Sequence, residues 1–166
     1  KEVFSKAMAD AGYGDLADAL WENRQALLEN SAEVAAMIIA MQHGHADICC
    51  IYDMRTGTAP YCPLFDIRTH KPIHGYYSMV AFNALYRLGT QVESQCDEAR
   101  LYVLVASDGK KHAAMIANLT GKKQDLTIEG VDLENARYSL IDQEHLLSWI
   151  PNANEIQNND VVLIEW

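Results

Sequence analysis

The first third of the chain carries apolar residues at helical spacing. Over residues 16–29, leucines lie among charged and amide side chains, which predicts an amphipathic helix. A second helix is expected to begin at Asn30 or Ser31 as N-cap, with Glu33 in its first turn, and to end at Gly44. Its apolar positions are Val34, Met37, Ile38, Ile39 and Met41. They leave little polar face, so we expect this helix to be buried on most sides.

A continuous apolar run and a long loop follow. The sequence DICCIYD at residues 47–53 predicts a strand covered on both faces, as in a parallel sheet packed against helices. The loop after it spans about 18 residues and contains Gly57, Pro60, Pro63 and Pro72, and loops of this length are usually functional or mobile. Residues 74–88 then place apolar side chains on one stripe before Gly89, which predicts a third helix.

Short runs rich in β-forming residues make up the rest of the chain. They lie at residues 101–106, 112–119, 125–129, 136–141 and 161–166. Turn sequences separate them, notably SDGK at 107–110, TG at 120–121 and EG at 129–130. Spacings of about 10 to 12 residues are typical of an antiparallel sandwich. The pattern therefore predicts an α+β chain with a boundary near residue 97, between a helical segment (1–97) and an antiparallel β-sandwich domain (98–166).

Composition and charge narrow the function classes. The chain has 166 residues, 49% of them hydrophobic and 22% charged, as in soluble globular proteins. Its longest apolar run, residues 34–41, is too short to span a bilayer, and its start has no signal-peptide pattern. The net charge of −10 argues against nucleic acid and anionic membrane surfaces as partners. A neutral ligand such as a sugar is unaffected by this charge.

The cysteines bear on the cellular compartment. Cys49 and Cys50 are neighbours, and neighbouring side chains of a strand point to opposite faces, so we expect no disulfide between them. We interpret these two, Cys62 and Cys96 as buried thiols in a reducing compartment, which predicts a cytoplasmic protein. A disulfide framework remains the alternative.

The order of these elements resembles a known enzyme class. The resemblance is carried by YDMR at 52–55, PLFD at 63–66, KPIHGYYSMVAFNALYRLG at 71–89 and LYVLVASDGKKHAAMIANLT at 101–120. It is to the C-terminal part of clan-A retaining glycoside hydrolases, of the β-xylosidase, α-L-iduronidase and α-L-arabinofuranosidase types. In these enzymes the last unit of a (β/α)8 barrel leads into a β-sandwich that packs on the side of the barrel. The resemblance covers the chain from about residue 11 to its end.

This resemblance implies a sugar-binding rim. Residues 47–53 would correspond to the eighth barrel strand and residues 74–88 to the eighth helix. Active sites of such barrels lie at the C-terminal ends of the strands. Tyr52, Asp53 and Arg55 would then border a sugar pocket, where Asp53 could bond hydroxyl groups and Tyr52 could present a stacking face. The loop at 56–69 would lie over the pocket and set substrate selectivity.

The resemblance does not supply a complete catalytic pair. Retaining enzymes need an acid/base and a nucleophilic carboxylate about 5 to 5.5 Å apart. The family takes them from the ends of the fourth and seventh strands, and the chain is too short to contain the fourth. Relatives carry Asn-Glu-Trp-Asn at the nucleophile, whereas this chain has Trp21-Glu22-Asn23 within a helical pattern. Glu22 is therefore either the nucleophile's counterpart or, the interpretation we favour, a solvated helix carboxylate.

Other chemistry has weaker support in the sequence. His43 and His45 near Asp47 have the residue types of a zinc site, but no convincing second pair of ligands follows, because Pro72 separates His70 from His74. Cys62 lacks the framing of a nucleophile. We therefore expect neither a metal nor a cofactor.

Three aromatic residues of the β half, Tyr138, Trp149 and Trp166, leave sugar binding there as an alternative to core packing. Together these patterns predict a C-terminal fragment or degenerate relative of a glycoside hydrolase that is not catalytic alone. The alternative is a non-catalytic module that binds carbohydrate or a partner subunit. Because residues 34–41 and 47–53 would expose an apolar surface without a barrel, we expect a homodimer or a companion barrel chain to cover it.

Overall fold

The structure is a computed structural model that describes residues 14–48, 50, 64–65 and 69–166. Two helices, α2 (Gly14–His43) and α3 (His74–Tyr86), precede all the strands named below. The strands are β1 (Thr90–Val92), β2 (Leu101–Ser107), β3 (His112–Asn118), β4 (Gln124–Asp125), β5 (Arg137–Ile141), β6 (Leu146–Ile150), β7 (Glu155–Ile156) and β8 (Val161–Glu165). The α+β class expected from the sequence is confirmed.

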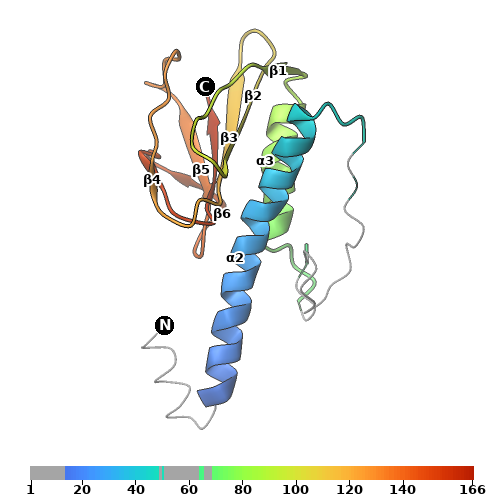
Figure 1. Cartoon of the computed structure of the whole chain (residues 1–166), viewed down its shortest axis with the longest axis vertical. Coiled ribbons are helices and arrows are strands. Elements are labelled where there is room, and N and C mark those ends of the chain that lie inside the picture. Colours follow the sequence, from blue (N-terminus) through green and yellow to red (C-terminus); the bar gives the residue numbers. More distant parts are fainter. Residues whose placement is uncertain (1–13, 49, 51–63, 66–68) are drawn as a thin grey trace.

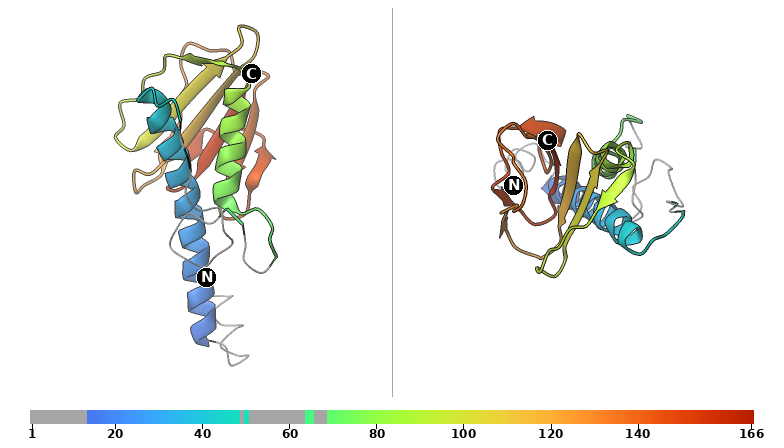
Figure 2. Two further views of the ribbon diagram at one scale, coloured as in Figure 1. Left: turned by 90° about the vertical axis from the view of Figure 1, so that its right-hand side faces the viewer. Right: turned by 90° about the horizontal axis from the view of Figure 1, so that it is seen from above.

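The strands form an antiparallel sheet with a layer on each face. Six of them pair in the order β1-β2-β3-β8-β5-β6, and β4 pairs with β7 in a small second sheet. Figures 1 and 2 show α2 and α3 side by side on one face of the large sheet. The pair β4-β7 and its loops cover the other face. The fold is therefore three-layered, with a sandwich-like part on the side away from the helices.

Alternation along β3 builds the two hydrophobic cores. Ala113, Met115 and Ala117 belong to the cluster shared with the helices. Ala114 and Ile116, between them in sequence, belong to the cluster under β4-β7. This is the period of two that a strand buried on both faces requires. Because one cluster contains residues of both helices and of the sheet, the helical segment and the β half pack together, while the domain boundary near residue 97 stays a prediction.

The two helices expected over residues 16–44 are one helix. Helix α2 runs without interruption for 30 residues, so the predicted N-cap at Asn30 or Ser31 is wrong. The hydroxyl of Ser31 donates instead to the carbonyl of Leu28 at 2.7 Å, a bond that serine makes inside helices. The Ser31 carbonyl accepts a 2.8 Å bond from the Ser78 hydroxyl of α3. Ser31 therefore marks where the helices touch.

The expected burial of the second half of α2 is confirmed. Val34, Ile38 and Ile39 are buried, while Met37 and Met41 are half-buried. These side chains are covered within this chain, so this part of α2 does not contribute the exposed apolar surface that the sequence suggested. In Figures 1 and 2 the N-terminal part of α2 extends beyond the sheet and beyond α3. None of the described helices combines the length and the apolar character that crossing a membrane requires.

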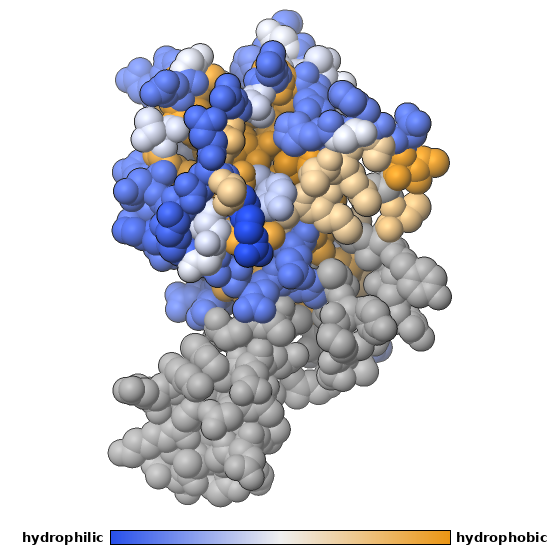
Figure 3. All heavy atoms as spheres, in the orientation of Figure 1, coloured by the Kyte–Doolittle hydropathy of each residue, from blue (hydrophilic) through white to orange (hydrophobic). Residues whose placement is uncertain are grey.

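The buried strand expected at 47–53 is wrong at the three of its positions that the structure describes. Asp47, Ile48 and Cys50 belong to no strand, and Ile48 is 80% exposed. Helix α2 ends instead in a turn closed by bonds from the Gly44 and Ala46 amides to the Ala40 and Met41 carbonyls. In Figure 3 hydrophobic colours gather on the right, where the segment after α2 lies in Figure 1. The other positions of this predicted strand lie outside the described residues.

The helix expected at 74–88 and most of the predicted strands are confirmed. Helix α3 ends two residues early, and Gly89, at φ +81°, adopts the left-handed conformation that favours glycine at a helix end. The strand expected at 125–129 is reduced to the two residues of β4, and Leu126 and Ile128 pack on the core outside any strand. The sequence analysis missed β1, β6 and β7.

Candidate functional site

The sugar-binding rim expected from the resemblance falls outside the described residues. This holds for Tyr52, Asp53 and Arg55, and for the start of the loop expected to cover them. Glu22 lies within α2, as its helical sequence pattern predicted. The assignment of these residues to a site therefore stays a prediction, and the described residues offer other polar groupings.

A carboxylate and imidazole cluster lies at the start of α3. His74 donates from Nε2 to the Asp142 carbonyl at 3.1 Å. In the turn between β5 and β6, the Asp142 Oδ1 accepts from the His145 amide at 2.7 Å and contacts His145 Nδ1 at 2.8 Å. Burial raises the pKa of Asp142, but the hydrogen bonds from the Glu144 and His145 amides outweigh it and hold that pKa below its ordinary value.

Asp160 carries a buried carboxyl group next to this turn. It is 5% exposed, and its Oδ2 accepts the Gln157 amide at 3.0 Å. Burial raises the pKa of Asp160 to about 6, and the nearby Asp142 carboxylate adds to this effect. The cluster can therefore exchange a proton near neutral pH. Because Asp160 is enclosed, this proton affects folding rather than a bound ligand.

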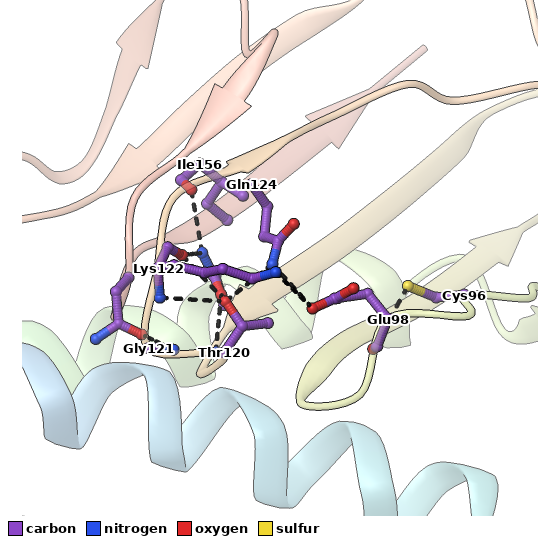
Figure 4. Close-up of polar contacts among 9 residues, drawn as sticks. Cys96, Glu98, Thr120, Gly121, Lys122, Gln124 and Ile156 are labelled. Carbon is purple, nitrogen blue, oxygen red and sulfur yellow. Dashed lines mark hydrogen bonds and ion pairs between the residues drawn. The ribbon is translucent and has the colours of Figure 1, made fainter.

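A second polar network is centred on the buried Asn118 side chain. Its Nδ2 lies 2.9 Å from the Lys122 carbonyl and 3.1 Å from the Ile156 carbonyl, and its Oδ1 accepts the Thr120 hydroxyl at 2.7 Å. Figure 4 shows this turn reaching Glu98, whose Oε1 accepts from Gln124 at 3.1 Å. Each of these groups is satisfied by its neighbours, so the network joins β3, β7 and the loop before β2 rather than offering a site.

The described residues contain no group of three or more histidine, cysteine, aspartate or glutamate side chains placed to hold a metal. His43 is engaged elsewhere: its Nε2 donates to the Val103 carbonyl at 2.8 Å, and its Nδ1 accepts from Gln91 at 3.2 Å. His43 thus fastens the end of α2 to β1 and β2. His45 lies in the turn that follows, at φ +54°.

The cysteines depart from their predicted burial. Cys50 and Cys96 are both exposed, so the expectation of buried thiols is wrong for these two. Cys96 lies in the polar connector between β1 and β2, outside the two hydrophobic clusters of the described residues. Cys49 and Cys62 lie outside the described residues, and the cytoplasmic location stays a prediction.

The aromatic side chains of the β half divide into core and surface. Tyr138 is half-buried against the core under β4-β7. Trp166 packs on that core and stacks on His112, with ring centroids 5.4 Å apart and planes at 15°. Trp149 is 64% exposed on the edge strand β6. Of the three candidates for sugar stacking, Trp149 has the most open ring.

A half-open cavity of about 490 Å³ lies between the C-terminal ends of the two helices and the edge of the sheet. Its walls come from Gln42 of α2, Phe82, Leu85, Tyr86 and Arg87 at the end of α3, Gly89, Thr90 and Gln91, and Leu104, Val105 and Ala106 of β2. The sequence analysis did not find it. The one available signal was Tyr86, a large aromatic residue three positions before Gly89.

Comparison with known proteins gives a likeness of fold. No family model matches the chain, and no curated protein sequence matches it. Two xylanases of glycoside hydrolase family 30 resemble it in structure: one of subfamily 8 from Clostridium acetobutylicum (TM-score 0.59, 13% identity) and an endoxylanase from Clostridium papyrosolvens (TM-score 0.60, 9% identity). A conserved exported protein from Bacteroides fragilis matches 58% of this chain and 22% of its own, with a TM-score of 0.51 and 11% identity.

The structural matches cover most of this chain but a much smaller share of each xylanase. Each xylanase match covers 83% of this chain, but the chain spans 38% of the length of each xylanase. At such identities the likeness concerns the fold. It agrees with the fold expected from the resemblance to the C-terminal part of clan-A glycoside hydrolases.

Proposed function

We propose that this chain forms the C-terminal part of a glycoside hydrolase and does not hydrolyse glycosides alone. The observation that carries the proposal is the likeness of 83% of the chain to 38% of each of two xylanases, one 13% and the other 9% identical in sequence. In this arrangement α2 and α3 are the last two helices of a barrel, and the sheet is the sandwich on its side. Both helices pack one face on the sheet, as that arrangement requires.

Glu22 supports the absence of activity in the isolated chain. Catalytic residues of (β/α)8 barrels lie at the C-terminal ends of strands or in the loops that follow them. Glu22 instead belongs to a helix whose backbone runs from Gly14 to His43. This supports its interpretation as a helix carboxylate, so both the nucleophile and the acid/base come from a part of the barrel that precedes this chain.

The partner proposed for the helices is the rest of the barrel. Val80 of α3 is 37% exposed, and Ile48 after α2 is 80% exposed. These residues give the helical side an apolar surface that a barrel covers in the proposed enzyme. In its absence, a second copy of the chain covers the same surface, which makes a homodimer the expected state of the isolated chain.

The test is to join this chain to the barrel segment that its gene context encodes. We expect the region upstream to encode strand-helix units with two carboxylates at strand ends, and the joined protein to hydrolyse an aryl β-xyloside or α-L-arabinofuranoside. The chain alone is expected to give no turnover. Turnover by the purified chain alone would overturn the proposal.

The second candidate is a non-catalytic module that binds carbohydrate or another subunit. It is favoured by Trp149, whose exposed ring on an edge strand is suited to stacking on a sugar. Retention of the chain on insoluble xylan, lost on Trp149→Ala, would support this candidate over the first.

A further inference from the structure

The cavity at the C-terminal ends of α2 and α3 has the form of a small-molecule site. Its volume of about 490 Å³ lies within the range of roughly 300 to 1,000 Å³ that such sites occupy. Three separate parts of the chain form it: the end of α2, the end of α3 with the following turn, and β2. It lies on the opposite edge of the large sheet from Trp149, because β1 and β6 are the two edge strands.

One side of the cavity is aromatic and its floor is aliphatic. Tyr86 is 72% exposed, and its ring centroid lies 6.3 Å from that of Phe82, with the planes tilted by 40°. Leu85, Leu104 and Ala106 are buried and fix the floor. An open aromatic face beside a rigid apolar floor suits the C–H face of a sugar ring.

The other side of the cavity carries planar amides and a hydroxyl. Gln91 donates one Nε2 hydrogen to His43 Nδ1 at 3.2 Å, and His43 is itself held by the Val103 carbonyl. This chain of bonds orients the Gln91 amide, whose second N–H and Oε1 have no partner among the described residues. Gln42 and Thr90 also line the cavity. Amides of this kind donate to and accept from vicinal hydroxyl groups.

The charge of the cavity points to a neutral ligand. Of the described residues that line it, Arg87 alone carries a charge, and Arg87 is exposed. None of the described lining residues is a carboxylate that could bind a cation or an amine. In a chain of net charge −10, every described lining residue other than Arg87 is neutral.

We propose that this cavity binds a neutral sugar ring, stacked on Tyr86 and hydrogen-bonded by Gln91 and Gln42. The site consists of described residues and needs no barrel, so it goes beyond the proposed function and does not depend on it. Its role is to hold a carbohydrate chain where the ends of α2 and α3 meet the edge of the large sheet. A failure of the hydrolysis experiments would not contradict the proposal that this cavity binds a sugar.

Titration of the isotope-labelled chain with xylotriose and, separately, with cellotriose tests the site by NMR. We expect chemical-shift changes at Tyr86, Gln91 and their neighbours with at least one of these sugars, and affinity in the millimolar to micromolar range. Tyr86→Ala, at an exposed position where folding is preserved, is expected to weaken binding by about tenfold or more because the stacking surface is lost.

The matched control is Val131→Ala, which removes an exposed apolar side chain outside the residues that line the cavity. It is expected to leave the affinity unchanged. Unfolding curves of both variants verify that each is folded. The proposal is overturned if neither sugar shifts the resonances of the cavity at about 10 mM, well above the expected Kd. It is equally overturned if Val131→Ala abolishes binding while Tyr86→Ala does not.

Discussion

Asp160 is a residue whose ionisation opposes folding. Its carboxyl group is 5% exposed, and burial raises its pKa to about 6. The folded state therefore holds the proton more tightly than the unfolded chain, in which the pKa of an aspartate is near its ordinary value of 3.8. The stability that depends on this proton is complete below the unfolded pKa and is lost as the pH rises through the folded pKa.

Asp160→Asn is expected to remove this dependence. The amide oxygen of asparagine can still accept the Gln157 N–H, but the side chain carries no charge. Relative to wild type, the variant should gain roughly 1 to 3 kcal/mol in unfolding free energy between about pH 4 and pH 8. Urea unfolding at several pH values measures this gain.

Asp132→Asn, at an exposed carboxylate in a loop, is the control for the Asp160 experiment. Its difference from wild type should stay nearly constant over the same pH range. A constant difference for Asp160→Asn as well would show that the Asp160 carboxyl group is not held neutral by the fold.

Asn118 offers a second test at the scale of single residues. Its buried amide bonds the Lys122 and Ile156 carbonyls and the Thr120 hydroxyl, so Asn118→Ala removes several hydrogen bonds made by one buried side chain. We expect a loss of roughly 2 to 4 kcal/mol in unfolding free energy.

The comparison for Asn118 is Asn158→Ala, which removes one bond, from the Gly121 amide. That variant should lose no more than about 1 kcal/mol, because the exposed amide regains water. Thermal unfolding of both variants provides the measurement. Equal losses of unfolding free energy in the two variants would contradict the claim that the Asn118 side chain stabilises the fold more than that of Asn158.

At the scale of elements, α2 shows where a local pattern misleads. Asn30, Ser31 and Glu33 have the residue types of a helix start, and yet the helix passes through them. Serine satisfies the pattern of an N-cap, but it also fits where two helices touch, since its hydroxyl bonds back to the preceding turn. The contact with α3, which decided the outcome, comes from residues more than forty positions away.

Glu33→Pro distinguishes one continuous helix from two. In a continuous helix the Glu33 amide is bonded within the helix, and proline there should cost about 3 kcal/mol or more. If a helix began at Ser31, proline in its first turn would be tolerated. Chemical unfolding, with circular dichroism for helix content, measures the loss.

Glu33→Ala controls for the removal of the side chain, which is exposed, and should change stability by less than about 0.5 kcal/mol. If Glu33→Pro proved as stable as Glu33→Ala, the helix would have to be broken near Glu33, and the continuous α2 would be contradicted.

The β half was more predictable because its signals are local. Glycines that adopt positive φ at Gly109 and Gly121 end strands at the positions expected from their turn sequences. The strand β6 was missed because Leu147, at φ +59°, interrupts the regular alternation near its start. The strand expected at 47–53 was wrong at Ile48 because an apolar run specifies burial only where a neighbouring element is present to cover it.

At the scale of the whole molecule, the candidate sites differ in how far sequence reveals them. The cavity beside Tyr86 is assembled from α2, α3 and β2, and no single stretch carries its pattern. The resemblance to the end of a glycoside hydrolase was visible because several motifs occur in a fixed order. The likeness of fold to two xylanases agrees with it.

The exposed apolar surface of the helical side leads to a prediction about association. Ile48 and Val80 are exposed, and in the proposed enzyme the rest of the barrel covers them. We expect light scattering to show a dimer whose population rises with concentration. Val80→Asp, on the outer side of α3, should shift it toward monomer, whereas Val131→Asp, at an exposed loop position, should not. A monomer at all concentrations would contradict the prediction.

The central claim is that this chain is the C-terminal part of a glycoside hydrolase and lacks the catalytic carboxylates. The most direct measurement compares hydrolysis of an aryl β-xyloside by the purified chain with hydrolysis by the same chain joined to the barrel segment encoded upstream. The account predicts no turnover above background for the chain alone and clear turnover for the joined protein. Turnover by the chain alone, or none by the joined protein on any aryl glycoside, would contradict it.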